Sequence, residues 1–154
     1  MKDPTVSVIM PAYNHERFVG EAIESILNQT LSDFEFIIIN DGSTDGTDRV
    51  IGNYKDPRIR YYSQENIDAP NTLNRALSLT KGKYISIINS DDLYHPERLS
   101  CLIESAESKE AKFVITDIVF IDESSNVIKD PSHAYNSWFG GLKSTYLNLS
   151  LIHI

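Results

Sequence analysis

The chain has 154 residues, of which 41% are hydrophobic and 23% are charged, as is typical of a single globular domain with its own core. A formal net charge of -8 at pH 7 argues against nucleic acid as a partner, and no apolar stretch is long enough to span a bilayer. The one cysteine, Cys101, excludes an intrachain disulfide and fits a reducing compartment, so we expect a cytoplasmic location.

Short apolar runs alternate with helical patterns from the N-terminus onward. Val6–Met10 predicts a strand. From Phe18 to Leu27 apolar residues recur at the helical period, and Asn14 is the expected N-cap of that helix. Phe34–Ile39 is almost continuously apolar, which predicts an interior parallel strand covered on both faces.

The middle of the chain continues this alternation. The loop Asn40–Thr47 is rich in Gly, Ser, Thr and Asp, so we expect it to expose backbone N–H groups before a short helix at about Asp48–Tyr54. Arg58–Tyr62 predicts a strand near the edge of the sheet, because it carries two arginines. A loop at Asn66–Pro70 is then expected to lead into a helix at Leu73–Thr80.

Two adjacent carboxylates follow the next predicted strand, Tyr84–Ile88. They are Asp91 and Asp92, and Pro96 then suits the first turn of a further helix. Ligands of open α/β sheets bind beyond the carboxyl ends of the strands, so this pair is a candidate site. A divalent cation between the two carboxylates and an anionic substrate would relieve their repulsion.

The alternation predicts an α/β fold, with a doubly wound, mostly parallel sheet and helices on both faces. Phe113–Ile121 is the fifth predicted strand, and Glu123–Asn126 predicts a hairpin turn. Parallel strands would bring Pro11–Asn14, Asp41 and the acid pair to one edge of the sheet.

Beyond Asp130 the pattern fails. Residues 131–154 are expected to form an irregular tail belonging to an incomplete region of the domain. The final stretch, residues 149–154, resembles a peptide produced when adapter DNA is translated onto a truncated gene, and we expect no evolved function of it.

Four stretches of the sequence together resemble family 2 glycosyltransferases of the GT-A fold. They are Val6–Asn14, Ser25–Thr30, Phe36–Thr47 and Gly82–Asp92, in the order and spacing of that family. The resemblance covers about residues 5–122. It implies a GT-A (Rossmann-like) domain whose residues 1–130 form the nucleotide-sugar-binding part, with the acceptor side incomplete in residues 131–154.

The resemblance also implies an activity and a set of site residues. Such enzymes are similar in moving a sugar, with inversion and metal assistance, from a nucleotide-sugar, most often UDP-linked, to an acceptor hydroxyl. Asp41 would bind the base or ribose, and Asn66 would lie in the loop that closes over the nucleoside. The residues expected to bind the nucleotide-sugar are Pro11, Ala12, Tyr13, Asp41, Asn66 and Asp91, and those expected to hold Mn²⁺ or Mg²⁺ are Asp92 and Asp91.

The acceptor side is less defined. The resemblance implies a glycan or a lipid-linked acceptor, and peripheral association of the longer parent protein with the inner face of the membrane. No residue is identified as the general base, which is expected in the missing C-terminal half, so we expect the fragment itself to be inactive. Structural roles are expected for Asp117 and Asp122.

Two other functions stay open. A sugar-nucleotide nucleotidyltransferase shares this sheet type, but it would carry a Gly-rich loop with Lys or Arg after the first strand, which Pro11–Asn14 lacks. A binding module without chemistry would keep the nucleotide pocket and need no base.

Several positions depart from the family or fall outside the site. The family usually has an acid at the position of Asn89 and a glycine at that of Asp68, where a positive φ would be strained. The histidines, His15, His95, His133 and His153, show no metal-binding spacing and are expected to be surface or capping residues.

Overall fold

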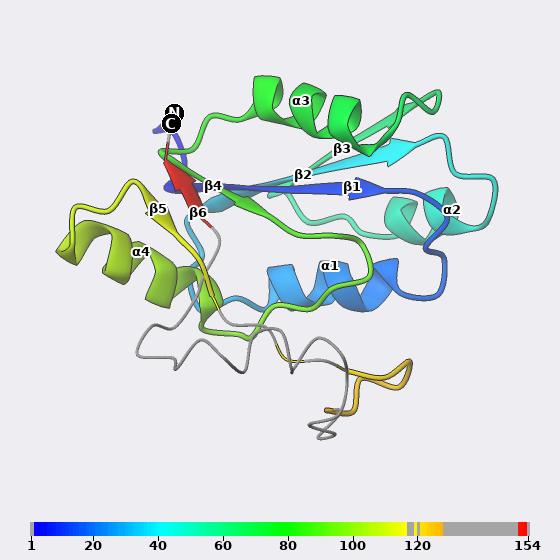
Figure 1. The fold of residues 1–154 in the computed structure, drawn as a ribbon. Coiled ribbons are helices and arrows are strands. Elements are labelled where there is room, and N and C mark those ends of the chain that lie inside the picture. The colour runs from blue at the N-terminus through cyan, green and yellow to red at the C-terminus, as the bar shows by residue number, and fades with distance from the viewer. Residues whose placement is uncertain (1, 117–118, 120, 128–150, 154) are drawn as a thin grey trace.

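The computed structural model describes residues 2–116, 119, 121–127 and 151–153, and strands alternate with helices along most of its length (Figure 1). In chain order the elements are β1 (Val6–Ala12), α1 (Val19–Leu27), β2 (Phe34–Asp41), α2 (Thr47–Gly52), β3 (Ile59–Gln64), α3 (Ala69–Leu79), β4 (Tyr84–Ile87), α4 (Arg98–Ser108), β5 (Phe113–Val114) and β6 (Leu151–His153).

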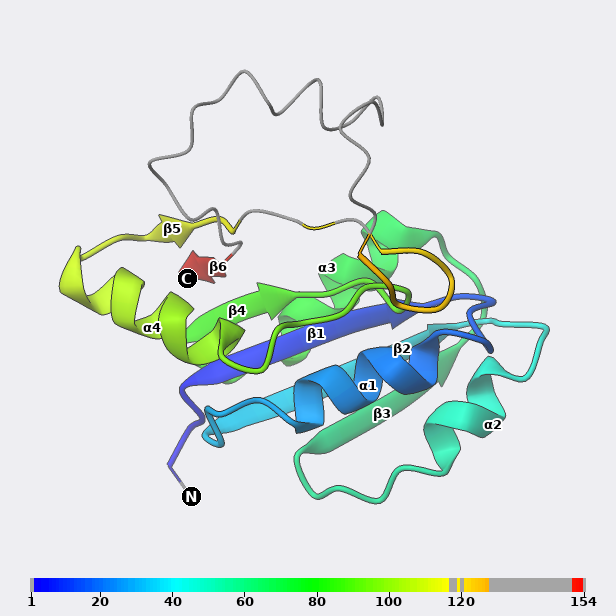
Figure 2. The ribbon, with the colours of Figure 1, turned by 90° about the horizontal axis from the view of Figure 1, so that it is seen from below.

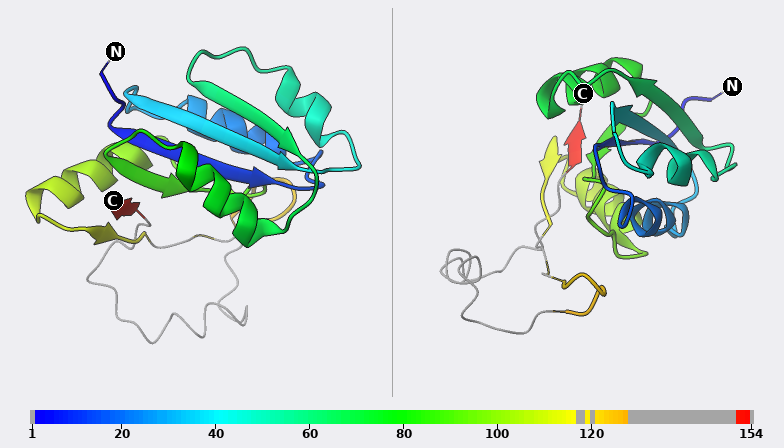
Figure 3. Two further views of the ribbon diagram at one scale, coloured as in Figure 1. Left: turned by 90° about the horizontal axis from the view of Figure 1, so that it is seen from above. Right: turned by 90° about the vertical axis from the view of Figure 1, so that its right-hand side faces the viewer.

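The described strands form one sheet in the order β3-β2-β1-β4-β6-β5. The four strands from β3 to β4 pair in parallel, whereas β6 is antiparallel to both β4 and β5. Figure 2 shows α1 and α4 in front of one face of the sheet, and the left view of Figure 3 shows α3 in front of the other. This arrangement confirms the predicted doubly wound, mostly parallel α/β fold.

The most deeply buried strand is β2, the neighbour of the edge strand β3, in which all eight residues are buried. Phe36 and Ile38 belong to the core cluster that includes α1 and α4, whereas Ile37 and Ile39 pack with Ala76 of α3. Successive side chains of a strand point to opposite faces, so a continuous apolar run is what a strand covered on both sides requires. The prediction of an interior strand is confirmed, and β3 lies at the sheet edge as predicted.

A buried carboxylate near the start of β2 closes the amino-terminal end of the sheet. Glu35 is only 8% exposed, and it accepts hydrogen bonds from Ser7 Oγ at 2.7 Å, Lys81 N at 2.6 Å and Arg60 Nη1 at 2.5 Å. Burial raises the pKa of Glu35, but the hydrogen bonds from Ser7, Arg60 and Lys81 outweigh it and hold that pKa below the usual 4.5. The network ties β1, β2, β3 and the turn before β4 together.

The helix starts differ from the predictions in three places. Helix α4 begins at Arg98, so Pro96 lies before the helix and not in its first turn as predicted. Helix α1 begins at Val19, and no side chain caps it, so the prediction of Asn14 as its N-cap is wrong. Asn14 instead has a φ of 53°, a conformation that Asn adopts more readily than most residues. Helix α3 begins at Ala69, inside the predicted loop, because Asp68 caps it by accepting a hydrogen bond from Asn71 N at 3.0 Å.

Asp68 also bears out an expectation about its backbone. Its φ is 74°, the positive value expected where the family usually has glycine.

Among the residues that the structure describes, no helix is long and apolar enough to cross a membrane.

The last part of the sheet is shorter than predicted. The strand predicted at Phe113–Ile121 is wrong in extent, because β5 ends at Val114, where its pairing with the short strand β6 ends. Ile121 pairs with Val127 in an isolated antiparallel bridge, which confirms the predicted hairpin turn. Leu151–His153, predicted within the irregular tail, form β6, and the rest of residues 131–154 lie outside the described residues.

The Glu35 network predicts a pH-dependent contribution to stability. Replacing Glu35 with Gln should lower the free energy of unfolding at neutral pH by about 1.5–3 kcal/mol, because a buried charged acceptor is lost. Since the folded pKa of Glu35 lies below 4.5, its contribution is present above pH 4.5 and is lost as the pH falls through the folded value.

Denaturant unfolding of the parent and Glu35→Gln proteins, at neutral pH and well below pH 4.5, measures this difference. Glu104→Gln, at an exposed position of α4, is the matched control and should change stability little. A difference between parent and Glu35→Gln that stayed constant across the acidic range would contradict the role given to the charge.

Candidate functional site

Most of the residues predicted to bind a nucleotide lie where β1, β2 and β3 end. In the parallel register Ala12 of β1 pairs with Asn40, and the next residue of β2, Asp41, pairs with Gln64 at the end of β3. Ala12 is buried, whereas Tyr13 just beyond it is 47% exposed. The edge therefore presents an exposed aromatic ring beside the end of β2.

Asp41 is the most buried charged group of this edge, with 3% of its surface exposed. Its Oδ1 accepts hydrogen bonds from Gln64 Nε2 at 2.6 Å and from the backbone N–H of Ile67 at 3.0 Å. A carboxylate can accept about four hydrogen bonds, so these contacts leave it further capacity. Asp41 can thus hold the β3–α3 loop and still accept a donor from a ligand.

The loops after β2 and β3 touch at Gly42. Its φ is 73°, and a Cβ added there would lie 2.7 Å from Asn66 N. Asn66, predicted to lie in the loop that closes over a nucleoside, joins the two loops, because its Nδ2 donates to the backbone carbonyl of Asp41 at 3.0 Å. Only glycine gives both the left-handed backbone and the space for this approach.

The loop Asn40–Thr47 is fastened to the segment that follows β1. Thr44 N donates to Asn14 Oδ1 at 2.8 Å, and Gly46 N donates to Glu16 Oε2 at 2.8 Å. Ser43 N donates to Asn40 Oδ1 at 3.1 Å. The expectation that this loop exposes its backbone N–H groups is therefore wrong for these three residues, since each N–H has a side-chain acceptor.

The acid pair lies in the loop after β4, which is the neighbour of β1 on the side away from β2. Asp91 and Asp92 are both exposed, and Asn89 Nδ2 donates to Asp92 Oδ2 at 2.8 Å. The amide that stands where the family usually has an acid thus contacts the predicted metal ligand. The two nucleotide-binding regions of the prediction flank the end of β1, with Asp41 on one side and the acid pair on the other.

His15 links these two sides, although only a surface or capping role was expected for it. Its backbone N–H donates to Thr47 Oγ1 at 2.9 Å, its Nδ1 lies 2.7 Å from Ser90 Oγ, and its Nε2 lies 3.9 Å from Asp91 Oδ2. Its position three residues after β1 was the available signal, because that point faces the loop after β4. The spacing of the histidines gave no indication of this role, because it does not match a metal-binding pattern.

The residues present fit a divalent cation only in part. No group of three or more His, Cys, Asp or Glu side chains is arranged for a metal ion among the residues that the structure describes. Mg²⁺ commonly uses one or two carboxylates together with substrate phosphates, which two exposed, adjacent aspartates can supply. Asp91 and Asp92 therefore suit a metal that arrives with a phosphate ligand.

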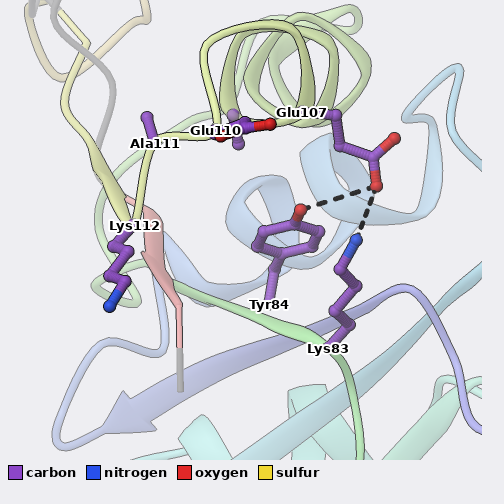
Figure 4. Close-up of a pocket in the computed structure, with 7 residues that line it drawn as sticks. Lys83, Tyr84, Glu107, Glu110, Ala111 and Lys112 are labelled. Carbon is purple, nitrogen blue, oxygen red and sulfur yellow. Dashed lines mark hydrogen bonds and ion pairs between the residues drawn. The ribbon is translucent and has the colours of Figure 1, made fainter.

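A cavity lies near each end of the sheet. One of about 200 Å³ lies beside Asp91 and is lined by Phe18, Glu21, Leu93 and the turn around Glu123. A larger one, of about 460 Å³, lies at the amino-terminal end of β4, where Lys83 Nζ pairs with Glu107 of α4 at 2.8 Å (Figure 4). The smaller cavity adjoins the candidate site, whereas the larger one lies apart from all of its residues.

Comparisons with known proteins point to one family. The family Glycosyl transferase family 2 matches residues 7–153 of this chain. Chondroitin synthase of Escherichia coli is 38% identical over 136 residues, which cover 86% of this chain and 19% of that protein. The uncharacterized glycosyltransferase MJ1057 of Methanocaldococcus jannaschii is 37% identical over 136 residues, covering 84% of this chain and 47% of that protein. The chain spans less than half the length of these relatives.

Solved structures show the same fold. TarS 1-349 of S. aureus in complex with UDP-GlcNAc matches with a TM-score of 0.70 at 24% identity, covering 74% of this chain and 34% of that one. Mannosyltransferase PcManGT of Pyrobaculum calidifontis, in complex with GDP-Man and Mn²⁺, matches with a TM-score of 0.67 at 22% identity, covering 88% of this chain and 39% of that one. The GT-A fold expected from the sequence is confirmed.

The contact at Gly42 yields a prediction with an internal control. Gly42→Ala should lower the free energy of unfolding by about 1–3 kcal/mol, because alanine is strained at positive φ and its methyl group would meet Asn66. Gly52→Ala, in helix α2 with no atom within 4 Å of the added Cβ, should be neutral or stabilise the protein by up to about 1 kcal/mol.

Denaturant unfolding of the two variants tests this contrast directly. Equal stabilities of Gly42→Ala and Gly52→Ala would show that the loops after β2 and β3 tolerate separation, contrary to the packing described above.

Proposed function

The chain belongs to glycosyl transferase family 2, and we propose that it binds a UDP-linked sugar donor for inverting transfer to an acceptor hydroxyl. The observation that carries the proposal is the placement of Asp41 and the acid pair on either side of the end of β1. A nucleotide-sugar has its base at one end and its diphosphate nearer the other, so two separate polar regions at one sheet edge suit it.

The nucleoside end is assigned to Asp41, Asn66 and the Pro11–Tyr13 segment. The exposed ring of Tyr13 offers a surface on which a base can stack, with Pro11 and Ala12 forming the wall beneath it. Asp41 offers an acceptor for a base N–H or a ribose hydroxyl, which would be a charge-assisted hydrogen bond. Asn66 holds the loop that would cover the nucleoside.

The diphosphate end is assigned to the acid pair. Asp92 and Asp91 would hold Mn²⁺ or Mg²⁺ against the phosphates, and such a cation neutralises the charge that develops on the leaving diphosphate. His15 contacts Ser90 and lies near Asp91, and it would thereby steady the loop that carries both carboxylates. Asn89 would orient Asp92 through its hydrogen bond.

The acceptor is proposed to approach through the smaller cavity beside Asp91. Phe18 and Leu93 there offer apolar surface for the face of a sugar ring, and Glu21 and Glu123 offer acceptors for hydroxyl groups. A glycan or a lipid-linked saccharide fits this chemistry. Peripheral association of the longer protein with the inner face of the membrane stays a prediction.

Transfer also requires a general base, and no described residue is assigned that role. Asp122 accepts hydrogen bonds from Asn126 N and Ser124 N, each at 2.9 Å, which fits the structural role expected for it. The hydrogen bonds from Asn126 and Ser124 lower its pKa, which makes it a weaker base. Asp117 lies outside the described residues. Donor binding without transfer is therefore the second candidate function for this chain.

Metal-dependent binding of UDP is the direct test. Isothermal titration calorimetry of the chain with UDP should show affinity higher by about tenfold or more with Mn²⁺ than without it, the worth of charge-assisted contacts. Asp92→Asn should remove most of that increase, because an amide is a poorer ligand for a hard cation.

Asp3→Asn, an exposed substitution before the first strand, is the matched control and should retain the full increase. The same affinity for UDP with and without Mn²⁺, in a sample with an intact unfolding transition, would overturn the metal role. No measurable affinity for UDP under either condition would overturn the proposed donor.

A further inference from the structure

The stretch Ser25–Thr30 fastens the loop that follows the acid pair to the end of helix α1. It is one of the four stretches by which the chain resembles its family, but none of its residues belongs to the predicted nucleotide or metal site. Ser25 Oγ accepts a hydrogen bond from Tyr94 N at 3.1 Å, and Thr30 N donates to Pro96 O at 2.9 Å. The end of α1 therefore holds the segment that leads from the acid pair to helix α4.

Gln29 makes the central contacts of this junction, and it is only 6% exposed. Its Nε2 donates to His95 O at 2.8 Å, and its Oε1 accepts a hydrogen bond from Leu99 N at 3.0 Å. The first N–H groups of a helix have no partner within it, and Glu97, the N-cap of α4, supplies no side-chain acceptor. Gln29 supplies that acceptor from outside the helix, so one side chain both caps α4 and anchors the loop before it.

The acid pair is thus attached to the protein on both sides. Before it, Ser90 is 2% exposed, and its Oγ lies 2.7 Å from His15 Nδ1. After it, Tyr94 is 8% exposed, and its backbone N–H is held by Ser25. The residues between these two points, Asp91–Leu93, are all exposed. A short span with two fixed ends has few conformations open to it, so the positions of both carboxylates depend on the two attachments.

We propose that Ser25 and Gln29 are positioning residues for the acid pair, because they fix the loop after Asp92 in the arrangement that a divalent cation and a diphosphate require. A small cation such as Mg²⁺ demands near-ideal ligand geometry, and a loop that must first be ordered binds its ligand less tightly. Both residues act through the backbone of Tyr94–Leu99 rather than by contact with the cation. The inference rests on the proposed function, since the acid pair is the metal site assigned there.

The dependence of UDP affinity on the metal tests this role. In calorimetry, Ser25→Ala and Gln29→Leu should each reduce the increase in UDP affinity that Mn²⁺ gives the unmodified chain, by about threefold or more, because residues that support metal ligands strongly affect metal affinity. The affinity for UDP without Mn²⁺ should change little, because the nucleoside end of the site, around Asp41, lies on the other side of β1.

Two further variants separate positioning from stability. Ser25→Thr keeps a hydroxyl where Tyr94 N requires an acceptor, and it should retain the increase. Glu35→Gln, which is expected to destabilise the protein at the amino-terminal end of the sheet, should also retain it. Because Gln29 is buried, Ser25→Ala, at a partly buried position, carries the test if Gln29→Leu fails to fold.

Each outcome has a distinct meaning. An increase with Mn²⁺ that keeps its parent size in folded Ser25→Ala and Gln29→Leu overturns the positioning role and leaves the metal site standing. An equal reduction in Glu35→Gln assigns the effect to lost stability and overturns the positioning role as well. Absence of any increase in the unmodified chain overturns the metal role within the proposed function and this inference together.

Discussion

The fully buried strand β2 carries a buried carboxylate near each end, and each must find hydrogen-bond donors. Glu35 and Asp41 both belong to β2, and both are less than a tenth exposed. Burying an unpaired charge is far more costly than a folded domain can tolerate, so the surrounding chain is arranged around these two groups. The rest of the architecture follows from how differently the two ends satisfy that requirement.

At the amino-terminal end the protein satisfies its own carboxylate. Three donors from β1, β3 and the turn before β4 converge on Glu35, and Gly82 N donates to Ser7 Oγ beside it at 2.8 Å. At the carboxyl end Asp41 receives its donors from one side, through Gln64 and Ile67. The sheet therefore has one end sealed by internal hydrogen bonds and one end where loops, acids and an exposed aromatic ring surround a carboxylate with acceptor capacity.

Sequence patterns predicted the sheet because a strand that is buried on both faces must be apolar at almost every position. The continuous apolarity of Phe34–Ile39 predicted an interior strand, and the two arginines of Arg58–Tyr62 predicted that β3 lies near the edge of the sheet. Local sequence patterns were less informative where contacts with distant segments determine the role of a side chain. Asn14 looks like a helix cap in sequence, but Thr44 from a distant loop takes its side-chain oxygen.

Side chains that act through a neighbour were the hardest to foresee. His15 and Gln64 carry no motif, and their contacts arise only once parallel pairing sets Asp41 opposite Gln64 and brings β4 beside β1. The predicted fifth strand failed for a related reason, since a strand extends only as far as its partner, and β6 pairs with only two residues of β5. The family motifs located the ends of the strands, whereas register determined which side chains meet there.

We expect a nucleotide to bind at the carboxyl end of the sheet. Backbone amide chemical shifts, recorded by NMR before and after addition of UDP with Mg²⁺, report binding at every position at once. The largest changes should fall on Tyr13, Ile67 and the Asp91–Asp92 pair, around the end of β1. Changes concentrated instead at Lys83, Glu107 and Lys112, around the larger cavity at the other end of β4, would contradict it.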